Sequence, residues 1–147
     1  MAMVDRREPH EAWYARVRDH VPTVWVEEPE TITGFLQKPF TLYKVVCLGS
    51  GADGASSTVK RRYSEFEKLH ALLRARYGGL GMLLPSLPPK RPLSNAKAVV
   101  LQRLRALTIF CERIVANPYL RYDASWIDFL TPGVSFLDGS AAQTPHA

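Results

Sequence analysis

The stretch Arg61-Arg62-Tyr63-Ser64-Glu65-Phe66 joins a predicted strand at residues 57–62 to a predicted helix at residues 65–77. Ser64 and Glu67 have the spacing of a capping box, in which two side chains satisfy backbone N–H groups where a helix begins. Apolar residues then recur at helical spacing until Gly78-Gly79, where we expect the helix to end. These apolar residues are Phe66, Leu69, Leu73 and Tyr77. An arginine pair and an aromatic residue therefore lie at the end of a strand, directly before a helix.

Two more strands are expected upstream of this junction. Residues 23–27 are β-branched and aromatic, and residues 40–48 are apolar nearly throughout, a composition typical of strands. The region 31–39 contains the turn between them, and the glycine-rich segment 49–54 forms an exposed hairpin loop. These segments predict three antiparallel strands.

Prolines dominate the segment that follows the first helix. Each proline fixes φ and disfavours helix in the residue before it, so the segment is expected to follow a stiff, extended path. The prolines are Pro85, Pro88, Pro89 and Pro92. A long helix is predicted over residues 95–116, where apolar residues recur on one face. A short helix near residues 124–130 offers Trp126, Ile127 and Leu130 to the core.

These elements predict an α+β fold: a three-stranded antiparallel β-sheet packed against a helical subdomain of three to four helices with a polyproline loop. The length of 147 residues and the 46% hydrophobic fraction suit one soluble domain. We expect a charged N-terminal arm that can form a short helix at residues 1–21, the domain at residues 22–132, and a flexible tail at residues 133–147.

Charge, cysteines and hydropathy restrict where the protein is expected to reside and what kind of partner it is expected to bind. The net charge of +5 favours an anionic partner without distinguishing phospholipid, nucleic acid and acidic protein. Cys47 and Cys111 each lie in an apolar run without metal-ligand spacing, which indicates buried free thiols in a reducing compartment. No apolar run is long enough to span a membrane, and the N-terminus lacks the apolar core of a signal peptide. We expect a cytoplasmic protein that reaches membranes peripherally.

Several function classes are disfavoured. The four histidines have no spacing or acidic partners suited to metal or triad chemistry, and no nucleophile elbow or phosphate loop is present. Cations alternate with carboxylates outside residues 61–90, unlike the basic stripe with interleaved aromatics that is typical of a nucleic-acid binder. We therefore expect no enzyme activity, no metal or other cofactor, and no nucleic-acid partner.

The order of three strands, helix, proline loop and long helix over residues 22–132 is similar to that of the phox-homology (PX) family. Arg61-Arg62-Tyr63 followed by Ser-Glu-Phe resembles the strand-to-helix motif of that family, and Pro85-x-x-Pro88 resembles its proline motif. Arg103-x-x-x-Leu107-x-x-Phe110 resembles its second-helix motif. The resemblance implies a sorting-nexin-like domain that binds phosphoinositides.

The pocket of that family implies four lipid-binding residues here. Arg62 would grip the 3-phosphate of phosphatidylinositol 3-phosphate, and Tyr63 would form a floor under the inositol ring. Lys90 would contact the 1-phosphate, and Arg103 would hydrogen-bond the 4- and 5-hydroxyls. The implied function is recruitment of a peripheral protein to endosomal membranes for trafficking or sorting.

Membrane contact is expected around this pocket. The insertion loop of the family corresponds to residues 91–97, in which Leu93 is the one large apolar residue. Phe35 and Leu36 in the first turn offer a second wedge, although apolar turn residues are at least as often packed against their own domain. Nonspecific attraction to an anionic leaflet is expected from Lys38, Arg91 and Lys97.

Alternatives remain for two of these motifs. An arginine pair at a strand end is often a solvated charge pair, and Arg61, which faces away from Arg62 in a strand, is expected to be structural or a peripheral membrane contact. Pro85-x-x-Pro88-x-Lys90 also fits a ligand for SH3-type domains, which bind a polyproline helix with a flanking cation. The alternative function is a protein-interaction module of the same fold, or a module that binds another phosphoinositide.

Overall fold

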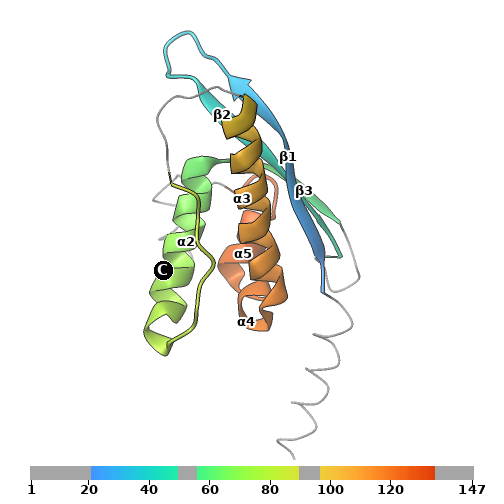
Figure 1. Ribbon diagram of the computed structural model, residues 1–147, viewed down its shortest axis with the longest axis vertical. Coiled ribbons are helices and arrows are strands. Elements are labelled where there is room, and N and C mark those ends of the chain that lie inside the picture. Colours follow the sequence, from blue (N-terminus) through green and yellow to red (C-terminus); the bar gives the residue numbers. More distant parts are fainter. Residues whose placement is uncertain (1–20, 50–55, 90–96, 135–147) are drawn as a thin grey trace, which may run out of the picture.

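A three-stranded antiparallel sheet forms one layer of the structure, a computed structural model that describes residues 21–49, 56–89 and 97–134. Its strands are β1 (Thr23–Ile32), β2 (Phe40–Leu48) and β3 (Ser57–Arg62), in the order β1-β2-β3 (Figure 1). The helical elements are α2 (Tyr63–Tyr77), the 3-10 turn η1 (Gly78–Leu80), α3 (Lys97–Ala116), α4 (Pro118–Arg121) and α5 (Ala124–Phe129). The predicted α+β fold is confirmed. The expected arm helix, the glycine-rich loop after Gly49 and all but the first residues of the expected tail lie outside the described residues.

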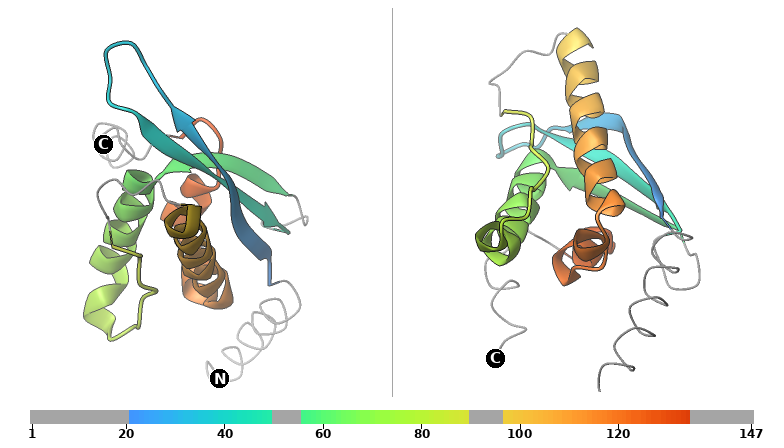
Figure 2. Two further views of the ribbon diagram at one scale, coloured as in Figure 1. Left: turned by 45° about the horizontal axis from the view of Figure 1, so that its top comes forward. Right: turned by 60° about the horizontal axis from the view of Figure 1, so that its bottom comes forward.

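One face of the sheet packs against the helices (Figure 2). Tyr43, Val45 and Cys47 alternate along β2 and belong to the core, as the period of two in a strand requires, and valines of β1 and β3 on the same face join them. The helices contribute Phe66, Leu69, Leu107, Phe110 and Trp126 to the same core. The long helix α3 is fixed to the edge of the sheet, because the Val26 N–H donates to the Thr108 hydroxyl at 3.0 Å. Among the described residues, no helix is long and apolar enough to cross a membrane.

The first strand is longer than predicted. β1 continues past Glu27 to Ile32 by way of an irregularity between Glu27 and Glu30, where Glu28 has a φ of 48°. Pro29 lies in this irregularity, on an edge strand, which is where a sheet tolerates a residue without an N–H group. The exposed turn between β1 and β2 therefore spans residues 33–39.

The start of α2 differs from the predicted capping box. The helix begins at Tyr63, and the side chain of Glu65 accepts the Arg62 N–H at 3.0 Å. The prediction that Ser64 and Glu67 cap the helix is wrong, because both residues already lie inside its first turns. A carboxylate in the first turn also interacts favourably with the helix dipole.

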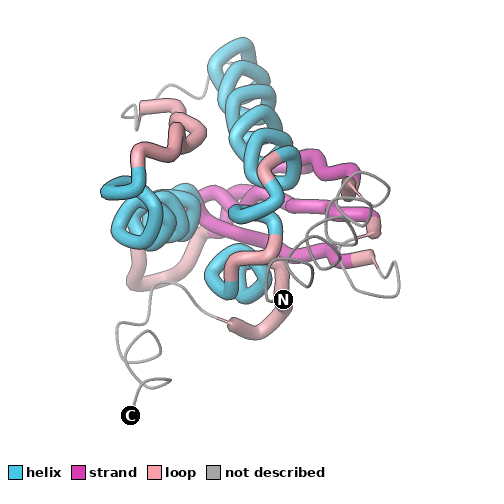
Figure 3. The backbone as a smooth tube through the Cα atoms, turned by 90° about the horizontal axis from the view of Figure 1, so that it is seen from below, coloured by secondary structure: helices cyan, strands magenta, loops and turns pink. Residues whose placement is uncertain are grey.

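The end of α2 agrees with the prediction, since the helix ends at Tyr77 and Gly78 is its C-cap. Gly78 keeps a helical φ of −59°, and the chain continues through the 3-10 turn η1 before Gly81 adopts a φ of 75°. Residues 82–89 then return along α2 on the side that faces α3 (Figures 1 and 3).

The short helix α5 presents a different set of side chains to the core from the predicted set. Trp126 and Leu130 are buried, as predicted, but the Ile127 side chain is 48% exposed and the prediction for it was wrong. Phe129 takes its place, because residues three and four apart share a helix face whereas Ile127 is turned about 100° from Trp126.

Both cysteines are buried and neither forms a disulfide, which confirms this part of the prediction. Burial raises the pKa of the Cys111 thiol well above its ordinary value. The thiol therefore stays protonated in the folded protein.

Asp123 joins the end of α2 to the start of α5. Its Oδ2 atom accepts hydrogen bonds from Arg76 at 2.8 Å and from the Tyr77 hydroxyl at 2.7 Å, and its Oδ1 atom accepts the Ser125 N–H at 2.8 Å. Burial alone would raise the pKa of Asp123, but these three hydrogen bonds outweigh it and hold the pKa below the ordinary 3.8. The folded state therefore favours the charged carboxylate.

The stability that Asp123 contributes should depend on pH. Because the folded pKa lies below the unfolded value, the contribution is complete above the unfolded pKa and is lost as the pH falls through the folded pKa. Asp123→Asn should lower the free energy of unfolding at neutral pH by about 1–3 kcal/mol. The free energy of unfolding of the variant should also fall less steeply than that of wild type as the solution is made acidic. Urea unfolding at a series of pH values checks this, and an equally steep fall in the variant would contradict it.

Candidate functional site

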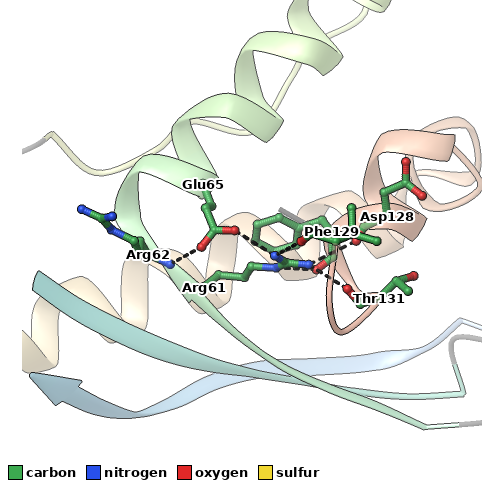
Figure 4. Close-up of polar contacts among 7 residues, drawn as sticks. Arg61, Arg62, Glu65, Asp128, Phe129 and Thr131 are labelled. Atoms are coloured by element: carbon green, nitrogen blue, oxygen red, sulfur yellow. Dashed lines mark hydrogen bonds and ion pairs between the residues drawn. The ribbon is translucent and has the colours of Figure 1, made fainter. Parts of the chain in front are cut away.

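The two adjacent arginines at the end of β3 have opposite surroundings (Figure 4). The side chain of Arg61 is buried and lies among α2, α5 and the segment after α5. Its guanidinium donates to the carbonyl oxygens of Asp128, Phe129, Thr131 and Val134 and to the Glu65 carboxylate. Arginine has five N–H donors, and these five bonds use them all. Arg61 is therefore structural, one of the two roles expected for it.

Arg62 points away from this cluster (Figure 4). Its side chain is partly buried, and the guanidinium carbon lies over the Phe40 ring, 4.1 Å from the ring centroid. Within residues 21–49, 56–89 and 97–134, no carboxylate forms an ion pair with Arg62. An arginine that is sheltered from water without a carboxylate partner is suited to binding an anion from outside the protein.

Tyr63 connects three elements next to Arg62. Its hydroxyl donates to the Pro88 carbonyl oxygen, and the Arg103 guanidinium carbon lies over its ring at 4.9 Å from the centroid. Arg103 also donates to the Pro89 carbonyl oxygen at 3.3 Å. Burial and the nearby Glu67 carboxylate raise the pKa of Tyr63, although the Arg103 charge opposes them. The phenol therefore stays neutral and keeps its hydrogen bond to the proline loop.

A groove of about 220 Å³ lies between the proline loop and α3. Its wall on α3 is formed by one helix face, since the lining residues of that helix recur at three- and four-residue spacing. The lining residues are Pro88, Pro89, Val99, Gln102, Arg103 and Ala106. Arg105 is exposed and does not line the groove, so the structure places Arg103 and not Arg105 beside Tyr63.

The structure thus brings three of the four expected lipid-binding residues into one region. Arg62 and Tyr63 are consecutive, and Arg103 lies over the Tyr63 ring. Lys90 lies outside the described residues, as do Arg91 and Leu93. Lys97 begins α3, but its side chain is also outside them.

The expected membrane wedge lies on the turn between β1 and β2. Phe35 is 100% exposed and Leu36 is 92% exposed, so neither side chain packs against the domain. Lys38 is exposed on the same turn. Figure 1 shows this turn at the same end of the molecule as the start of α3, whereas α4 lies at the other end.

The proline loop has the features of a scaffold. Pro85 is buried, and the Pro88 carbonyl oxygen is bonded to Tyr63. A ligand of an SH3-type domain presents its prolines to the partner. Burial of Pro85 therefore favours the scaffold interpretation of the loop over the SH3-ligand interpretation.

Sequence reasoning did not identify Phe40. Arg62 pairs with Leu42 in the sheet, so Phe40 is a diagonal neighbour of Arg62 on the same face. Knowledge of the pairing register between β2 and β3 would have revealed this neighbour, but the sequence does not determine that register.

Comparison with known proteins agrees with this geometry and confirms the resemblance. The family model described as "PX domain" matches residues 50–133. The chain is 35% identical over 115 residues to sorting nexin mvp1 of Aspergillus oryzae, a match that covers 78% of this chain and 14% of that protein. It is 30% identical over 108 residues to sorting nexin-3 of Schizosaccharomyces pombe, covering 71% of this chain and 73% of that protein.

A solved structure shows the same fold. The X-ray structure of a designed CISK-PX domain superposes with a TM-score of 0.62 at 31% identity, and the match covers 74% of this chain and 97% of that one. The family match, the relatives and the shared fold are all consistent with a module for phosphoinositide binding and membrane trafficking. The chain belongs to the PX domain family.

Proposed function

We propose that this domain binds phosphatidylinositol 3-phosphate through Arg62, Tyr63, Lys90 and Arg103, and that it recruits the protein to endosomal membranes for trafficking or sorting. The observation that carries the proposal is the contrast between the two arginines: Arg61 has all its donors bonded inside the protein, whereas Arg62 has no carboxylate partner among the described residues. The domain acts as a head-group receptor, without catalysis.

The chemistry of Arg62 suits a phosphate monoester. A guanidinium offers two parallel N–H groups to two phosphate oxygens, and each charge-assisted bond contributes about 1.5–3 kcal/mol. A lysine in its place would offer a point charge without the fork. In this proposal the 3-phosphate binds Arg62, and the inositol ring lies against Tyr63.

Arg103 supports a preference for the 3-monophosphate. It is held by the Tyr63 ring and the Pro89 carbonyl oxygen, beside a groove of about 220 Å³. Hydroxyls at positions 4 and 5 need only hydrogen-bond donors there, whereas added phosphates need more space and more cations. Lys90, directly after Pro89, is assigned to the 1-phosphate by its place in the family motif.

The proposal is tested by cosedimentation with vesicles that carry each phosphoinositide in turn, at physiological salt. Selective binding to the 3-monophosphate that Arg103→Ala weakens is the expected result. Binding that follows total lipid charge, and that falls equally for all phosphoinositides as salt rises, would overturn it.

Phe35 and Leu36 are expected to strengthen attachment to vesicles without contributing to head-group binding. Burying one such side chain in an apolar phase gains about 1.5–3 kcal/mol, and neither residue has packing to lose. Replacing both with serine should weaken vesicle binding at least about tenfold. Affinity for the soluble head group, measured by calorimetry, should stay unchanged.

The matched control for this double variant is Leu80→Ser. Leu80 is 76% exposed on η1, which follows the end of α2 far from the β1–β2 turn (Figure 1). Its replacement removes exposed apolar surface without touching the wedge. An equal loss of vesicle binding in both variants would contradict a wedge at residues 35 and 36.

A further inference from the structure

Phe40 lies where it can orient the arginine that is assigned to the phosphate. We propose that Phe40 is a positioning residue for Arg62: its ring holds the guanidinium in place and leaves the N–H donors available for the phosphate. This inference rests on the proposed function, because it names a residue that acts through Arg62 and does not touch the lipid.

The placement of Phe40 follows from the strand register. Phe40 begins β2, and its neighbour two residues on, Leu42, pairs with Arg62 of β3. Side chains two residues apart in a strand share a face, and diagonal neighbours across strands come within reach of a long side chain. The Arg62 guanidinium carbon accordingly lies 4.1 Å from the centroid of the Phe40 ring, which is itself partly buried.

An aromatic ring is a suitable partner for an arginine that must remain able to bind an anion. The face of the ring attracts the cation but carries no lone pair that would accept its N–H groups. A carboxylate at the same place would compete with the phosphate for those donors. The described residues supply Phe40 for Arg62 and a carboxylate for Arg61, which matches the two different roles.

Arg62 is also fixed at its backbone. The Glu65 carboxylate accepts the Arg62 N–H with one oxygen at 3.0 Å and binds Arg61 with the other at 2.8 Å. The backbone and the guanidinium of Arg62 are therefore held by different contacts, and Phe40 is the contact at the guanidinium. Pre-ordering a flexible arginine reduces the entropy that binding must otherwise lose.

The test separates the effect of an apolar side chain at position 40 from the effect of an aromatic ring there. Phe40→Leu keeps an apolar side chain and removes the ring, whereas Phe40→Trp keeps an aromatic face. Affinity for soluble inositol 1,3-bisphosphate is measured by calorimetry at a temperature where each variant is folded. We expect Phe40→Leu to bind about three- to tenfold more weakly and Phe40→Trp to bind at least as tightly as wild type.

Thr41→Val is the matched control, because Thr41 is adjacent in β2 and points to the opposite face of the sheet. It should bind as wild type does. If Phe40→Leu does not fold, Phe40→Trp decides: a folded tryptophan variant with weakened binding overturns the proposal. A folded Phe40→Leu variant with wild-type affinity also overturns it, since a purely structural residue alters the melting temperature and not the affinity of the folded protein.

The same titrations separate this inference from the proposed function. If wild type and Arg62→Ala bind the head group equally, the proposed function fails. If Arg62→Ala loses binding while both Phe40 variants keep it, only the positioning role of Phe40 fails.

Discussion

Arg62→Ala should reduce binding to vesicles that contain phosphatidylinositol 3-phosphate by at least about 100-fold while leaving thermal unfolding close to that of wild type. Two charge-assisted hydrogen bonds of about 1.5–3 kcal/mol each are lost from the phosphate. The folded protein loses only the contact with Phe40, because Arg62 forms no ion pair with another described residue. A large effect on binding is therefore combined with a small effect on stability.

Two further variants make this result interpretable. Arg62→Lys retains the charge but loses the fork, so its affinity should lie between those of Arg62→Ala and wild type. Arg105→Ala removes the same charge from an exposed position of α3 that does not line the groove. If Arg62→Ala binds vesicles no more weakly than Arg105→Ala in cosedimentation, binding depends only on the charge of the protein and not on the position of Arg62.

The different roles of Arg61 and Arg62 could be predicted in part from the sequence. Alternation in a strand requires that neighbouring side chains point to opposite faces, so one arginine of the pair had to turn away from the other. The partners of Arg61 could not be predicted, because its four carbonyl acceptors lie 67–73 residues further along the chain. Only the packing of α5 against α2 and β3 brings those carbonyl groups to the guanidinium.

The order of elements was predictable because the apolar spacing, the glycines and the prolines agree along the chain. The ends of elements were less predictable. Ser64 precedes Glu67 at capping-box spacing, whereas the residue three positions before Glu65 is Arg62, so the sequence pattern favours the wrong pair. Glu65 caps the helix instead, because β3 pairs with β2 as far as Arg62 and the helix begins directly after it. The exposure of Ile127 likewise depends on which face of a two-turn helix meets the core.

The residues of the candidate site were likewise predictable only in part. Arg62, Tyr63 and Arg103 were identified from motifs, and the structure places Arg103 over Tyr63. Phe40 belongs to no motif, and its contact with Arg62 follows from a register that side-chain pattern alone does not set. A motif thus predicts the residues that contact a ligand better than it predicts the residues that orient them.

Arg61→Ala is expected to lower the free energy of unfolding by about 3–5 kcal/mol, because it leaves the buried Glu65 carboxylate without its ion-pair partner. The carbonyl oxygens of Asp128, Phe129, Thr131 and Val134 also lose their common donor. For a domain with a total stability of about 5–15 kcal/mol, this loss removes a substantial share of the stability. Urea unfolding followed by circular dichroism measures it, with Arg62→Ala as the control that removes the neighbouring arginine.

A paired replacement separates the unpaired charge from the lost carbonyl bonds. In Arg61→Met combined with Glu65→Gln, the glutamine oxygen can still accept the Arg62 N–H, and no buried charge remains without a partner. This variant should be more stable than Arg61→Ala, although it still lacks a donor for the four carbonyl groups. If the two variants unfold at the same urea concentration, the carbonyl bonds rather than the ion pair account for the stability that Arg61 provides. If Arg61→Ala unfolds at the urea concentration of wild type, Arg61 does not stabilise the fold, and its burial has another cause.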